Sequence, residues 1–244
     1  MSGHHDADLS VHFQISRGEN RRFTYAQSAD SISVNPELVR QVSPPPYPTA
    51  VQQLLQRLPT GNLAEKLITE FFIDVNWRFG IPETWFRDAW AQTEKEILRP
   101  SVSSSAIQIN SNWLSLLFAI FVFAPRRSVD ANDLVLESPD RYFWYSLAAL
   151  RIAENNFIQR PSLSGTDPAA EGTVLGCLAV PLLANHLADR GRVSEAWKLV
   201  GLWIRMGESI GLHRDCDLRD WEPMSDSEKI LRRRAWWGMI VWDK

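Results

Sequence analysis

Two helical spacings of apolar residues near the C-terminus form the clearest pattern in the chain. The first predicts a helix over 193–210, and its apolar face consists of Val193, Ala196, Trp197, Val200, Ile204, Gly207 and Ile210. Gly211 follows where this spacing stops, and a glycine can adopt the left-handed conformation that ends a helix. A second helix begins with a capping box of Ser225 and Glu228, and its shared face consists of Ile230, Arg234, Trp237 and Val241.

Apolar spacing also predicts helices along the preceding part of the chain. The helical region begins near Thr49, and the second helix carries a face of Leu63, Leu67, Phe71, Val75 and Phe79. Pro82 suits the first position of a third helix, because the N–H that proline lacks needs no partner there. The segment Trp113–Ala124 is apolar on nearly every side, so we expect its helix to be central and buried.

Two pairs of a capping residue and a proline predict the starts of the next helices. Ser138-Pro139 begins a helix that runs to about Arg160, and Asp167-Pro168 begins one that ends at Gly191. Pro181 lies inside the latter helix, where proline removes a backbone hydrogen bond, so we expect a kink near Cys177. The whole pattern predicts an all-α fold, an array of antiparallel helices.

The C-terminal end of this array has no stop signal. The chain ends two residues after Trp242, inside the last predicted helix, so we expect the array to be truncated there. A helix end without its covering elements exposes apolar side chains to water. We therefore expect the isolated chain to present a hydrophobic patch and to associate.

The first 48 residues differ from the rest of the chain. They lack sustained periodicity and end in the proline-rich segment Ser43–Pro48, so we predict a mostly disordered tail over 1–48 and a helical domain over 49–244. Val11–Ile15 and Arg22–Tyr25 alternate in polarity and could pair as short strands. His4, His5, Asp6 and Asp8 could bind a metal ion, but we favour a solvated tail because nothing there fixes coordination geometry.

The charge and the cysteine count of the chain disfavour several kinds of function. A formal charge of −3 disfavours DNA binding by this chain itself, because DNA-binding proteins normally present a basic face. Cys177 and Cys216 are the only two cysteines, too few for a disulfide framework or a four-cysteine zinc site, and they fit a reduced intracellular compartment. The longest apolar run is too short to span a bilayer, and the N-terminus does not resemble a secretory signal.

The segment from Gly191 to Lys244 resembles the fungal-specific transcription factor domain, the regulatory middle homology region of fungal binuclear zinc-cluster transcription factors. The resemblance rests on an ordered series of elements: Ala196-Trp197, Gly201, Arg205-Met206, Gly211-Leu212-His213-Arg214-Asp215, Glu228, Arg232-Arg233-Arg234, Trp236-Trp237 and Asp243. With the upstream helices it covers roughly Thr49 to Lys244. The family pattern continues past the paired tryptophans to an Asp-Arg and a Gly-Arg-Pro segment, whereas this chain stops at Asp243-Lys244.

The resemblance implies a nuclear regulator of transcription whose helical domain restrains activation until a small-molecule effector or a partner changes its conformation. In that family a separate N-terminal module with six cysteines holds two zinc ions and reads DNA. Because this chain has two cysteines, zinc and DNA binding are implied only for the family, and we expect no cofactor in the chain itself. Transcriptional co-regulators or a second copy in a homodimer are the other partners implied.

His213 and Asp215 are the one pair that could serve acid–base catalysis. A histidine in a turn that ends a helix more often bonds local groups, and the chain has neither a nucleophile elbow nor a phosphate loop. We therefore interpret the motif Gly211, Leu212, His213, Arg214 and Asp215 as structural and expect no enzyme.

The basic run Arg232-Arg233-Arg234 could contact phosphate or form part of a nuclear import signal. Consecutive helical residues point in directions about 100° apart, however, so the three cannot form one flat patch. Glu228 is spaced to pair with Arg232, and Asp215 or Asp217 could pair with an arginine that is partly buried. We favour this structural role and expect Arg234→Ala to lower the melting temperature.

The tryptophans of the C-terminal region could form core or line a ligand pocket, and core packing is the commoner use. They include Trp197, Trp203, Trp221, Trp236, Trp237 and Trp242. Two other functional classes stay open beside the transcription regulator: a helical protein-interaction scaffold without DNA binding and, with least support, an enzyme.

Overall fold

The computed structural model describes residues 48–59, 62–98, 109–127, 136–159, 172–214 and 225–243. Within these residues the chain is all-helical, as the apolar spacing predicts. The helices are α1 (Pro48–Leu55), α2 (Asn62–Asp74), the 3₁₀ helix η4 (Asn76–Arg78), α3 (Glu83–Leu98), α4 (Ser111–Phe123), α5 (Pro139–Gln159), α6 (Thr173–Asp189), α7 (Val193–Ser209) and α8 (Asp226–Asp243).

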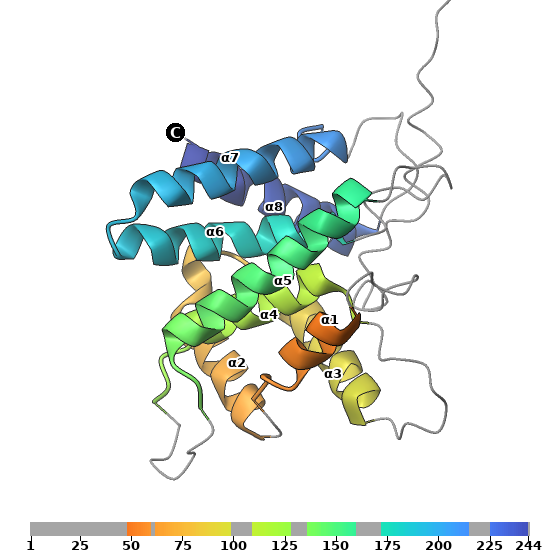
Figure 1. The fold of residues 1–244 in the computed structure, drawn as a ribbon, viewed down its shortest axis with the longest axis vertical. Coiled ribbons are helices and arrows are strands. Elements are labelled where there is room, and N and C mark those ends of the chain that lie inside the picture. The colour runs from red at the N-terminus through yellow and green to blue at the C-terminus, as the bar shows by residue number, and fades with distance from the viewer. Residues whose placement is uncertain are drawn as a thin grey trace, which may run out of the picture.

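The apolar helix α4 lies at the centre of the fold and packs against α1, α2, α5 and α6. Every residue from Ser111 to Val122 is buried, so the prediction of a central, buried helix is confirmed. In Figure 1, α5 crosses in front of α4, α6–α8 gather at one end of the molecule and α1–α3 lie at the other. Each of the eight α-helices contributes residues to one continuous apolar core.

Local hydrogen bonds explain where several helices begin. The Asn110 side chain accepts a bond from the backbone N–H of Asn112 at 2.8 Å and caps α4. The Ser138 hydroxyl accepts from the backbone N–H of Arg141 at 3.3 Å, which agrees with the predicted start of α5 at Pro139. Both caps satisfy backbone donors that a helix cannot satisfy itself.

The start of α6 differs from the prediction. The helix begins at Thr173, after Gly172 in the left-handed conformation (φ 77°), whereas Asp167-Pro168 lies outside the described residues. A side chain at Gly172 would collide with that of Asn110, so the glycine serves close packing as well as backbone conformation. The helix continues through Pro181, and the kink near Cys177 stays a prediction.

The antiparallel pair α6 and α7 is held by a close contact between a glycine and a tryptophan. A Cβ atom on Gly176 would lie 2.2 Å from the ring of Trp203, so only glycine leaves room for that ring. The Trp203 indole N–H donates to a carboxylate oxygen of Glu154 on α5 at 3.0 Å. Trp203 therefore joins α5, α6 and α7 and is fully buried.

Predictions for the N-terminal 47 residues, including the two short strands and the histidine and aspartate group at His4–Asp8, lie outside the described residues. Among the helices that the structure describes, none combines the length and the apolar character needed to cross a bilayer.

Candidate functional site

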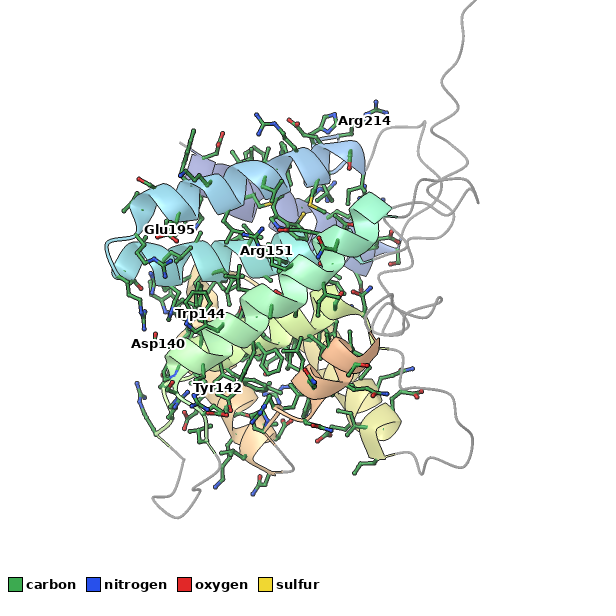
Figure 2. All side chains as sticks on the ribbon, in the orientation of Figure 1. Asp140, Tyr142, Trp144, Arg151, Glu195 and Arg214 are labelled. Carbon is green, nitrogen blue, oxygen red and sulfur yellow. The ribbon has the colours of Figure 1, made fainter. Side chains whose placement is uncertain are left out.

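The turn at Gly211 ends α7 as predicted. Gly211 has φ 73°, and the backbone N–H of Leu212 donates to the carbonyl of Gly207 at 2.9 Å, a bond that closes the helix end. Leu212 is buried, while His213 and Arg214 are exposed. Figure 2 shows Arg214 at the outer edge of the molecule, at the opposite end of α7 from Glu195. Asp215 lies outside the described residues.

Arg232 is the buried arginine of the basic run. Its side chain is 1% exposed, and one Nη atom donates to the backbone carbonyl of Ile210 at 2.9 Å. The bond ties α8 to the last residue of the α7 face. Arg233 and Arg234 are exposed, so the arginine expected to be buried is Arg232 and not Arg234. Its predicted pairing with Asp215 or Asp217 falls on residues outside the described part and stays a prediction.

Glu228 lies beside Arg232 on the buried side of α8. Its backbone N–H donates to the Ser225 hydroxyl at 3.2 Å, which is the half of the capping box formed by the serine. Burial raises the pKa of the Glu228 carboxyl to about 7, and the positive charge of Arg232 opposes that rise. The carboxyl group therefore titrates near neutral pH while it is packed inside the protein.

The face of α8 that packs inward is not the face that the sequence pattern selected. Leu231, Ala235 and Met239 are fully buried against α6 and α7, whereas Ile230, Trp237 and Val241 are 46%, 62% and 75% exposed. Both series have helical spacing, so periodicity alone could not choose between them. The close approach of Met239 to Gly207 shows what decides: a Cβ atom on that glycine would lie 3.1 Å from the methionine.

Helix α7 shows a smaller correction of the same kind. Ala196, Val200 and Gly207 are buried as predicted, but Val193 and Trp197 are each 60% exposed. Leu199 and Trp203 are buried in their place because α6 lies on that side.

The C-terminal tryptophans divide between core and surface. Trp203 belongs to the core, whereas Trp236 is half-buried with its ring centroid 6.1 Å from that of His213. Trp197 and Trp237 are exposed, and Trp221 lies outside the described residues. The His213 ring thus lies at the surface beside an aromatic ring, and no catalytic partner for it is seen among the described residues.

A pocket lies where the end of α8 meets α6 and the η4 turn. It has a volume of about 220 Å³, and its polar lining consists of Arg78, Asn185 and Arg234. Trp242 and Pro181 belong to its apolar walls. The sequence pattern did not reveal this pocket, because its residues come from three separate segments, at positions 78–81, 178–185 and 234–242.

Neither a metal centre nor an activated thiol is evident in the described part of the chain. No group of three His, Cys, Asp or Glu residues there is placed to hold a metal ion. Cys177 is buried in the core, and burial raises the pKa of its thiol, which disfavours the reactive thiolate.

The described residues form an all-helical domain with one shared core and a small pocket at one end. Comparison with family models matches residues 136–244 to the Fungal specific transcription factor domain. This segment contains the helices α5 to α8, so the resemblance that we found in the C-terminal region is confirmed.

Three curated proteins with transcriptional names are similar to the chain. Aurofusarin cluster transcription factor aurR2 of Gibberella zeae is 39% identical over 71 residues, which are 29% of this chain and 10% of that protein. Uncharacterized transcriptional regulatory protein C1F7.11c of Schizosaccharomyces pombe is 24% identical over 204 residues, 78% of this chain and 22% of that protein. A second S. pombe protein, Uncharacterized transcriptional regulatory protein C777.02, is 38% identical over 58 residues, 22% and 9% of the respective lengths.

The chain thus spans less than a quarter of each of these relatives. No solved structure matches it. The matched family model and these relatives are all named for transcription.

Proposed function

We propose that this chain is the regulatory helical domain of a fungal zinc-cluster-type transcription factor that acts in the nucleus, and that it is not an enzyme. The match of residues 136–244 to the fungal transcription factor domain carries the proposal. Two observations support it: the similarity to named transcription regulators extends over 78% of the chain in one case, and the fold is all-helical.

DNA and zinc belong to another part of the protein in this proposal. The chain has a formal charge of −3 and two cysteines, a poor composition for phosphate contacts or a zinc cluster. We propose that DNA is bound through a separate N-terminal module with six cysteines. Residues 49–244 form one domain in this proposal, supported by the core that α1 shares with α4 and α5.

A reporter assay tests the regulatory role. The whole chain is fused between a heterologous DNA-binding module and an activation domain, and transcription from the matching promoter is measured. A regulatory domain lowers reporter output by about tenfold relative to the same fusion with a flexible linker of equal length. Equal output at equal protein levels would contradict the proposal.

A helical interaction scaffold without DNA function is the second candidate. The exposed apolar residues of α7 and α8 favour it, because such residues commonly mark contact surfaces. A six-cysteine motif encoded just upstream of the chain would decide for the transcription factor. Its absence from the genomic sequence would favour the scaffold.

A further inference from the structure

The pocket at the end of α8 combines apolar walls with arginine side chains. Its apolar lining includes Phe79, Ile81, Leu178, Pro181, Val241 and Trp242. Its charged lining residues are Arg78 and Arg234, and the lining includes no acidic residue. A cavity of this composition complements a ligand with an apolar body and one negative charge.

Arg234 is the second arginine that lines the pocket. It makes no hydrogen bond or ion pair with any residue that the structure describes, although it is surrounded by protein on one side. Its guanidinium group lies against Gly80, where an added Cβ atom would come within 3.0 Å of the Nη1 atom. Gly80 also has φ 66°, so a glycine there serves both the turn and the approach of the arginine.

Arg78 is held in place from the opposite wall. One of its Nη atoms donates to the Asn185 side-chain oxygen at 2.7 Å, and the Asn185 amide donates to Asp189 at 2.9 Å. The Asp189 carboxylate therefore binds the amide, and Arg78 forms no ion pair with an acidic residue of the described part of the chain. A guanidinium group has five donors, so a second acceptor can bind Arg78 while the bond to Asn185 persists.

We propose that this pocket binds a small organic monocarboxylate, with its carboxylate on Arg234 and Arg78 and its apolar tail against Pro181 and Trp242. Arginine suits this role because its planar fork binds a carboxylate through two parallel hydrogen bonds. The volume of about 220 Å³ is below the range of drug-sized sites, roughly 300–1,000 Å³, so the ligand has on the order of ten non-hydrogen atoms. Nucleotides are too large and too polar for it.

The position of the pocket gives such a ligand a way to act on the domain. Pro181 contacts α8 closely, since a Cβ atom on Gly238 would lie 3.1 Å from its ring. A ligand bound between α6, α8 and the η4 turn therefore contacts three elements at once and favours the conformation in which they lie together. This effect of the ligand on the domain rests on the proposed regulatory function, whereas the binding of the ligand does not depend on that function.

Titration calorimetry on the whole purified chain tests the proposal. The probes are octanoate, used below its micelle-forming concentration, and octanamide, a neutral molecule of nearly the same shape. We expect octanoate to bind with a dissociation constant on the order of 0.1 mM and octanamide to bind at least about tenfold more weakly. Equal affinities, or no binding of octanoate to the folded chain, would overturn the proposal.

Variants locate the site. Arg234→Gln is expected to weaken octanoate binding about tenfold without changing the melting temperature, because the side chain is exposed. Arg205→Gln on α7 is the matched control, an exposed arginine outside the pocket, and is expected to bind as the unmodified chain does. Trp242→Ala is expected to weaken octanoate more than acetate. Equal effects of the two arginine substitutions would refute the assignment.

The reporter assay separates this inference from the proposed function. If octanoate binds through Arg234 but the chain does not change reporter output, the pocket is right and the regulatory function is wrong. If the chain lowers output but binds no carboxylate, the regulatory function stands and the pocket assignment fails.

Discussion

Arg232 and Glu228 lie on the inner side of α8. Both are buried, whereas most charged residues that the structure describes are not. They are 1% and 5% exposed, and the structure gives Arg232 a backbone carbonyl of the neighbouring helix as acceptor. A buried charge is tolerated only where other groups replace its hydration, so both residues depend on the close packing of α8.

Truncation of the Arg232 side chain tests its structural role. We expect Arg232→Met to lower the free energy of unfolding by about 2–4 kcal/mol, because the Ile210 carbonyl loses its donor and the buried carboxyl beside it loses a positive charge. Arg234→Met should change it by less than about 0.5 kcal/mol, because this arginine is exposed; this replaces the loss of stability at Arg234 that we expected from the sequence. Urea unfolding followed by far-ultraviolet circular dichroism measures both, and equal losses would contradict the assignment.

The carboxyl group of Glu228 predicts a pH dependence of stability. Its pKa is about 7 in the folded chain against an ordinary value of 4.5, so the folded state holds the proton more tightly than the unfolded state does. The free energy of unfolding should therefore fall by about 1–3 kcal/mol as the pH rises from about 4.5 to about 7.

Glu228→Gln isolates this contribution. The variant should not show the decrease in the free energy of unfolding that Glu228 causes. Burial lowers the pKa of His186, so this residue makes the free energy of unfolding rise with pH, and it does so in both proteins. Unfolding titrations at about pH 5 and about pH 8 give the two differences. Identical pH profiles for variant and unmodified chain would show that the Glu228 proton does not matter.

At the scale of elements, glycines set how closely the last three helices approach. Gly176 accommodates the Trp203 ring between α6 and α7, Gly207 accommodates Met239 between α7 and α8, and Gly238 faces Pro181 between α8 and α6. Each contact joins a different pair in the same three-helix group. A side chain added at one of them has to displace a packed neighbour.

The contact at Gly176 gives the sharpest test of this packing. We expect Gly176→Ala to lower the free energy of unfolding by about 3 kcal/mol, because the new methyl group would overlap the buried Trp203 ring. Gly201→Ala on α7 is the control, since nothing lies within 4 Å of a Cβ atom there. Removal of a helical glycine should stabilise by about 0.5–1 kcal/mol at that position. Similar destabilisation by both substitutions would refute the close contact.

At the scale of the whole molecule, the outer side of α8 is an apolar surface next to the pocket. Trp237 and Val241 lie there, and both side chains are exposed. Contiguous exposed apolar residues favour association, because contact removes their surface from water.

Self-association is the predicted consequence. Sedimentation velocity at increasing concentration should show the whole chain shifting from monomer to larger species. Trp237→Ser should weaken that association by about tenfold, whereas Ile73→Ser, which removes an exposed apolar side chain from α2, should not. A chain that stays monomeric throughout would contradict the prediction.

The sequence by itself determined the features that depend on neighbours along the chain. The buried helix α4, the caps at Ser138 and Ser225 and the left-handed Gly211 follow from local apolar runs and turn chemistry, and the structure agrees with each. The ordered motif of the last two helices also predicted the family whose model matches residues 136–244.

Only the tertiary structure decided which side of α8 is buried, which of three adjacent arginines enters the core, and that Arg78 and Arg234 share a pocket. A helix carries several apolar series with acceptable spacing, and the choice among them depends on the shape of the helices packed against it. Gly176, Pro181 and Gly207 set those shapes through contacts with residues on other helices. Such contacts do not appear in the periodicity of the sequence.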